Sequence, residues 1–105
     1  MAYGQQTAFR AQTTVINIAA TDSWVALQGA TALTNRFATK VHFMGKASDR
    51  LRLIYDRIAN IENASDELGS GNTIVEPNCT GLTFYGRLKG GSGDRAKIVV
   101  TEYGH

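Results

Sequence analysis

Short segments in which apolar and polar residues alternate dominate this sequence, and glycine, asparagine or aspartate residues separate them. The alternation is clearest in four stretches: FATKVHFM (37–44), RLRLIY (50–55), GLTFYGRL (81–88) and AKIVVTEY (96–103). A period of two residues places every second side chain on the same face, which is the pattern of a β-strand buried on one side. The β-branched run TVINI (14–18) and the short stretch 73–76 predict two further strands.

About six such strands, each ended by turn residues, predict an all-β fold, an antiparallel sandwich or barrel. Of the two we expect an antiparallel β-sandwich of jelly-roll-like form. The 105 residues suffice for one hydrophobic core, so we expect a single sandwich domain over 14–105. The segments GKASD (45–49) and GGSGD (90–94) have the composition of tight turns, and we expect each to close a β-hairpin. Pro77, the one proline, is expected at a sheet edge or just beyond a strand end.

The region after residue 48 also supports a helix. Apolar residues between 51 and 61 recur at helical spacing, and serine, aspartate and glycine stand where they could cap its ends. Arg50 and Arg52, which flank Leu51, favour a strand instead. We therefore expect a strand through Tyr55 and leave a short helix or an irregular loop open for Asp56 to Leu68.

Residues 1–13 are small and polar, a composition that does not close a core. We expect them to form an extended N-terminal arm. Its aromatic residues, Tyr3 and Phe9, would be exposed to water in an isolated arm, so either the arm docks on another surface or the terminus is frayed.

The segment SWVALQGATALTNRF (23–37) contains the only tryptophan of the chain. Glycine and β-branched residues interrupt it, which disfavours a helix, and no set of polar residues accompanies the tryptophan as in a ligand site. We expect Trp24 and Leu27 to close one end of the sandwich and residues 29–34 to cross between strands. Asn35 and Arg36 would then turn the chain into the strand that begins at Phe37.

No pattern of catalytic, cofactor-binding or metal-binding residues stands out, so we predict that the chain is not an enzyme. Cys79 is the only cysteine, and His42 and His105 have no partner at the spacing of metal ligands. Residues 91–96 match the G-x-G-x-x-A form but lack the helix that a dinucleotide site requires. No segment approaches the ~18 apolar residues of a membrane span, and a formal charge of +2 gives no reason to expect direct nucleic-acid binding.

Charge is distributed unevenly along the chain. Between Arg36 and Arg57 there are six basic and two acidic residues, whereas from Ile58 to Glu76 there are four acidic residues and no basic one. The two stretches either join neighbouring copies of the chain or pair within one copy. The candidate interface residues are Tyr3, Phe9, Arg10, Arg50, Arg52, Arg57, Glu62, Asp66 and Glu67.

Over roughly Ser23 to Tyr103 the chain resembles the small β-sandwich virion proteins of tailed bacteriophages. The resemblance is carried by SWVALQGATALTNR, an alternating strand that ends at Gly45, NTIVEPNCTGLTFYGRL, a glycine-rich loop and the closing KIVVTEYG. The sequence departs from that pattern between Asp56 and Gly71, where a longer acidic segment replaces a short turn.

The resemblance implies a head decoration or cement protein on the outer surface of a phage capsid, assembled in the cytoplasm of the host bacterium. Such a protein is expected to form a homotrimer and to bind the major capsid protein, without a cofactor. Another virion component, of the tail, connector or fibre base, is an alternative. A carbohydrate- or host-binding module is a second alternative, and it requires Trp24, Tyr85 and Tyr103 to be exposed together.

Overall fold

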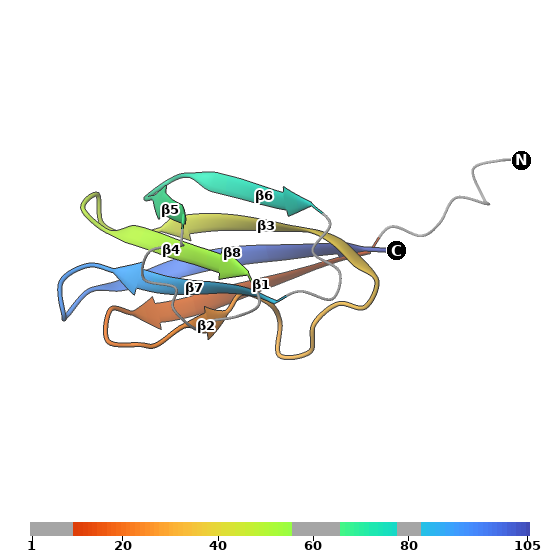
Figure 1. Ribbon diagram of the computed structural model, residues 1–105, viewed down its shortest axis with the longest axis horizontal. Coiled ribbons are helices and arrows are strands. Elements are labelled where there is room, and N and C mark those ends of the chain that lie inside the picture. Colours follow the sequence, from red (N-terminus) through yellow and green to blue (C-terminus); the bar gives the residue numbers. More distant parts are fainter. Residues whose placement is uncertain (1–9, 56–65, 78–82) are drawn as a thin grey trace, which may run out of the picture.

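The computed structural model describes residues 10–55, 66–77 and 83–105, which form eight β-strands and no helix. The strands are β1 (Arg10–Ala19), β2 (Val25–Ala26), β3 (Arg36–Met44), β4 (Arg50–Tyr55), β5 (Asp66–Gly69), β6 (Thr73–Pro77), β7 (Phe84–Lys89) and β8 (Arg95–Gly104). They make two four-stranded antiparallel sheets, in the orders β1-β8-β3-β6 and β2-β7-β4-β5, which pack face to face (Figure 1). The predicted all-β sandwich is confirmed.

The pairing of the strands defines a jelly roll. The first strand pairs with the last, β2 pairs with β7, β3 with β6, and β4 with β5. The chain is therefore one long antiparallel ribbon that is rolled into two sheets, and every connection except that between β4 and β5 crosses from one sheet to the other.

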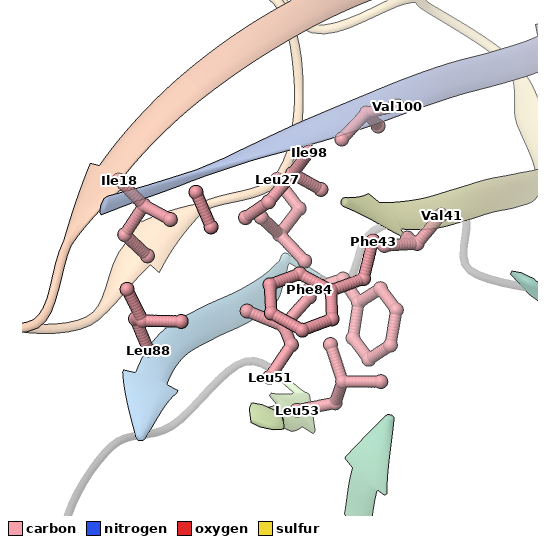
Figure 2. Close-up of a cluster of buried hydrophobic side chains, with 11 residues drawn as sticks. Ile18, Leu27, Val41, Phe43, Leu51, Leu53, Phe84, Leu88, Ile98 and Val100 are labelled. Carbon is pink, nitrogen blue, oxygen red and sulfur yellow. The ribbon is translucent and has the colours of Figure 1, made fainter. Parts of the chain in front are cut away.

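The core lies between the sheets and is built from the inward face of each alternating strand (Figure 2). Its fully buried members include Val41 and Phe43 of β3, Leu51 of β4 and Ile98 of β8. The buried residues of both sheets form one continuous cluster. The two-residue alternation therefore predicted the buried face of these strands correctly, because only the apolar positions can leave water without cost.

The two expected hairpins are wrong. β3 pairs with β8 and β6, whereas β4 pairs with β7 and β5, so the turn at 45–49 joins the two sheets. The loop at 90–94 likewise carries the chain from β7 in one sheet to β8 in the other. Alternation shows which face of a strand is buried, but two strands that face one core look the same in sequence whether they pair side by side or pack across the core.

Two expected boundaries also change, at residues 10 and 66, and the expected strand through Tyr55 is confirmed. β1 begins at Arg10, so residues 10–13 pair with β8 and do not belong to an arm. Residues 50–55 are strand, which excludes the helical alternative there, and residues 66–69 form β5 where a helix or loop was left open. Pro77 ends β6, an edge strand, as expected. Residues 1–9 and 56–65 lie outside the described ranges.

The segment 23–37 crosses between the sheets as predicted. β2 is only two residues long, Leu27 is buried, and the chain then passes to β3 in the opposite sheet. Asn35 has a φ of 52°, a left-handed conformation that turns the backbone into β3. Trp24 is half-buried, so the closure of this end depends mainly on Leu27.

A buried carboxylate, that of Glu102 in β8, binds the loop that follows Leu27 at two backbone positions. Glu102 has no exposed surface and accepts hydrogen bonds from the backbone N–H of Gly29 (2.8 Å) and Leu33 (3.0 Å). It also accepts them from Gln12 Nε2 (2.8 Å) and Arg36 Nη1 (3.0 Å). A Cβ on Gly29 would collide with the Gln12 amide, so glycine is what allows the loop to approach this closely.

These hydrogen bonds keep Glu102 ionised. Burial alone would raise the pKa of Glu102, but the donors from the backbone, Gln12 and Arg36 outweigh it and hold the pKa below its ordinary value. β1 and β8 each have ten residues, whereas β2, β4, β5 and β7 have two to six, so the longer sheet extends past the shorter one. The loop held by Glu102 covers the inner side of that longer sheet.

We expect Glu102→Gln to lower the free energy of unfolding by about 3 kcal/mol, because removing one partner of a buried ion pair costs about 3 to 5 kcal/mol and glutamine keeps one acceptor oxygen. Urea denaturation followed by tryptophan fluorescence measures the change. The matched control is Glu67→Gln, which removes a carboxylate that is 37% exposed and also pairs with two cations. Equal losses in the two variants would contradict the role given to Glu102.

The same carboxylate predicts an acid-dependent loss of stability. Because its pKa is lowered by folding, its contribution is complete above the ordinary glutamate value of 4.5 and is lost as the pH falls through the folded-state pKa. The difference in unfolding free energy between the wild type and Glu102→Gln should therefore shrink below about pH 4.5. Urea titrations between neutral and acid pH test this, and a difference that stays constant would contradict it.

Candidate interaction surfaces

The outward face of the shorter sheet carries four cations, which we call the cationic face: Arg50 and Arg52 of β4, and Arg87 and Lys89 of β7. The register places Arg50 directly opposite Lys89 and Arg52 directly opposite Arg87. Their neighbours Leu51, Leu53 and Leu88 are buried, so the alternating pleat directs all four cations away from the core. Like charges that face each other across two strands repel, which destabilises the sheet.

Glu67 of β5 lies on the cationic face and offsets part of this repulsion. Its Oε2 is 3.2 Å from Lys89 Nζ and 3.5 Å from Arg52 Nε. The hydrogen bond from Lys89 and the nearby Arg52 lower the pKa of Glu67. The candidate residues Arg52 and Glu67 therefore pair within one copy of the chain, which was one of the two arrangements expected from the charge distribution.

A pocket of about 290 Å³ opens beside the cationic face. Three cations line it, Arg52, Arg87 and Lys89, together with Ala20, Leu88 and Gly90. Guanidinium and ammonium groups that converge in this way suit the oxygens of a carboxylate or a phosphate. The chemistry that this face offers is anion binding.

The outward face of the longer sheet has a different character, and we call it the apolar face. It carries the large hydrophobic side chains that are most exposed among the described residues, Val15 (56%), Met44 (49%) and Val75 (55%). Its cations are Lys40, Arg95 and Lys97. Among the outward side chains that the structure describes on this face, none is a carboxylate. A pocket of about 530 Å³ lies at its end, beside Met44, Lys46 and Lys97.

Two carboxyl groups meet between the loops at one end of the sandwich. A Cβ on Gly90 would contact both Asp49 Oδ1 and Asp94 Oδ2, so these oxygens converge over that residue. Asp94 also accepts a hydrogen bond from Lys46 Nζ at 2.7 Å. The neighbouring Asp94 carboxyl, together with burial, raises the pKa of Asp49, whereas the nearby Asp49 carboxyl and the hydrogen bond from Lys46 lower the pKa of Asp94 to about 2.

Among the remaining candidate interface residues, the structure describes the side chain of Arg10, which does not join the cationic face. Arg10 lies at the opposite end of the sandwich, where it donates hydrogen bonds to the backbone carbonyls of His105 (2.8 Å) and Thr34 (2.9 Å). Asp66 opens β5 and pairs with Leu53 in the ladder. Four candidates lie outside the described residues: Tyr3, Phe9, Arg57 and Glu62.

Sequence reasoning missed both Glu102 and the contribution of β7. Glu102 continues the buried positions 96, 98 and 100 at a two-residue spacing, and a carboxylate on a buried face requires hydrogen-bond donors. That signal was present in the sequence. Arg87 and Lys89 also alternate with Leu88, but their position beside Arg50 and Arg52 depends on the pairing of β4 with β7, which alternation does not reveal.

Tyr85 and Tyr103 do not share the platform that a carbohydrate-binding module was expected to require. Tyr85 is outward on β7 in the shorter sheet, whereas Tyr103 is outward on β8 in the longer sheet, so the two rings belong to opposite faces of the sandwich. Within residues 10–55, 66–77 and 83–105, no three histidine, cysteine, aspartate or glutamate side chains gather as a metal site would require. No helix among these residues is long and apolar enough to span a membrane.

Comparison of the chain with protein-family models, with curated proteins and with solved structures finds no match. The cationic face, the apolar face and the buried carboxylates are therefore interpreted from their own geometry.

We expect Asp49→Asn to stabilise the protein at neutral pH. Because folding raises the pKa of Asp49, the wild type is destabilised as the pH rises through that value, and asparagine places an uncharged amide beside the Asp94 carboxylate. Thermal melts of the two proteins should show a Tm advantage for the variant that grows from pH 3 to pH 7. A variant that is less stable than the wild type at pH 7 would contradict this.

Proposed function

We propose that this chain is a structural virion protein that decorates and stabilises the head of a tailed bacteriophage. In this role it binds the outer surface of the capsid, associates with copies of itself as a homotrimer and has no enzymatic activity. The resemblance of residues 23–103 to small virion proteins motivates the proposal. The observation that carries it is the cationic face, whose like charges face each other across two strands, which destabilises the sheet and favours an acidic partner.

The fold and the surface chemistry support this role in different ways. Jelly rolls occur in viral capsid domains, in lectins and in cupins, so the fold alone does not decide among them. The described residues offer neither the metal ligands of a cupin nor the aromatic platform expected of a carbohydrate module. Four cations spread over two strands, with only the small pocket of about 290 Å³ beside them in the described part of the chain, suit a protein partner better than a small ligand.

The partner would be an acidic region of the major capsid protein. Arg50 and Arg52 are candidates for contacts with capsid carboxylates, and Arg87 and Lys89 extend the same surface. Salt bridges at the rim of an interface govern the association rate and the salt dependence more than the final affinity. Attachment to the capsid should therefore weaken steeply as the ionic strength rises.

A tail, connector or fibre-base component is the second candidate, since a cationic sheet face serves those positions as well. The two roles differ in copy number, which is in the hundreds for a head decoration protein and at most in the tens for a tail or connector protein. Gel densitometry of purified virions measures the copy number per particle. A copy number in the tens would contradict a head decoration protein and favour a tail or connector component.

The proposal predicts that the double variant Arg50→Glu, Arg52→Glu binds heads that lack the chain at least about tenfold more weakly than the wild type, because it replaces attraction by repulsion. The matched control is Arg95→Glu, Lys97→Glu, which makes the same charge change on the apolar face. Cosedimentation with purified heads at low and moderate salt measures both. Equal effects of the two double variants, or wild-type protein that does not bind such heads at all, would contradict the proposal.

A further inference from the structure

The two sheets have four edges, and three of them are protected against pairing with another strand. β2 has two residues and β5 has four, which are too short to template a partner strand. β6 contains a glutamate and ends at Pro77. Charged residues, proline and short length are the devices by which sheet proteins prevent edge-to-edge association.

The fourth edge, β1, has none of these devices beyond its first residue. It runs for ten residues and pairs with β8 without a bulge from Arg10 to Ala19. Residues 11–19, AQTTVINIA, contain no charge, no proline and no glycine. A long, regular and uncharged edge is what a second strand requires in order to add to a sheet.

The direction of the backbone groups on β1 follows from its ladder. Ala20 N–H donates to the Asp94 carbonyl (3.0 Å), one step beyond the last pair of the β1–β8 ladder. Residues in an antiparallel ladder alternate between hydrogen-bonded and non-hydrogen-bonded pairs, so the even-numbered residues of β1 form hydrogen bonds with β8. The N–H and C=O groups of the odd-numbered residues are therefore directed to the outer edge of the sheet. At the end of that edge, Ala19 N–H donates to Asp22 Oδ2 (2.8 Å).

Four residues remain with their backbone groups directed outward from β1: Ala11, Thr13, Val15 and Asn17. Their side chains are all exposed on the apolar face. In the described part of the chain, the backbone hydrogen bonds outside the ladders involve none of these four residues. The edge therefore presents a row of backbone N–H donors and C=O acceptors, at the spacing that the hydrogen bonds of another antiparallel strand require.

We propose that β1 is the contact between two copies of this chain, which pair their β1 strands antiparallel about a two-fold axis. With Thr13 opposite Val15 of the second copy and Ala11 opposite Asn17, all four edge positions form pairs, which gives about eight backbone hydrogen bonds between the chains. Pairs of β-branched side chains such as Thr and Val favour this arrangement.

Charge favours a second copy over an unrelated partner. Self-pairing of residues 11–19 places no like charges opposite each other, and the cations of the apolar face lie on β8 and β3, one and two strands further from the contact. An isologous contact of this kind closes on itself as a dimer and does not grow into a fibre. The dimer does not depend on the proposed function, and on a capsid it would link neighbouring trimers in pairs.

Sedimentation velocity of the full chain over a range of concentrations tests the proposal. The wild type should dimerise, and Val15→Lys should raise the dimer dissociation constant at least about tenfold, because it places a charge at the centre of the edge. Val75→Lys is the matched control: Val75 is equally exposed (55% against 56%) on the same face but lies on β6. It should dimerise as the wild type does.

Amide hydrogen exchange gives a second measurement that needs no variant. In the dimer, the N–H groups of Thr13, Val15 and Asn17 should be protected and should lose protection on dilution, whereas those of Gln12, Thr14 and Ile16 stay protected in both states. A wild type that remains monomeric, equal effects of the two lysine variants, or odd-numbered amides that exchange rapidly at high concentration would overturn the proposal. If the wild type is a trimer, Val15→Lys should abolish the further association of trimers in pairs, and an undiminished association would overturn the proposal too.

Discussion

The arrangement of this sandwich depends on one buried carboxylate. The longer sheet extends beyond the shorter one, and its inner side needs a cover that no strand provides. Glu102 supplies it by binding the backbone of the loop that follows β2, at Gly29 and Leu33, while Arg36 balances its charge. Because the same loop carries the chain from one sheet to the other, its position decides where β3 enters the longer sheet.

The sequence predicted most of the strands and their buried faces but not their partners. Alternation of apolar and polar residues is a local property, so β3, β4, β7 and β8 were recognisable, whereas β2 and β5 are too short to show it. Pairing in a jelly roll joins the two ends of the chain, and no local pattern encodes the contact of β1 with β8. The sequence predicted two of the four residues of the cationic face, Arg50 and Arg52, because they lie close together in one strand. It did not predict Arg87 and Lys89, because they come from another strand whose pairing the sequence does not reveal.

The two outer faces divide the surface by chemistry. The shorter sheet presents cations in facing pairs, for which Glu67 compensates at Arg52 and Lys89. The longer sheet presents valine and methionine, and its β1 edge is uncharged between Ala11 and Ala19. In the proposed role one molecule thus has an electrostatic surface for an acidic shell and a separate edge for a second copy, so binding to the capsid and self-association would not compete for the same residues.

Electron cryo-microscopy of the assembled phage head tests the central claim most directly, because it shows which face of the sandwich meets the shell. We expect density for the jelly roll on the outside of the capsid, with the cationic face of β4 and β7 against acidic residues of the capsid protein. A head without this density, or a sandwich whose cationic face is directed to the solvent, would contradict the account.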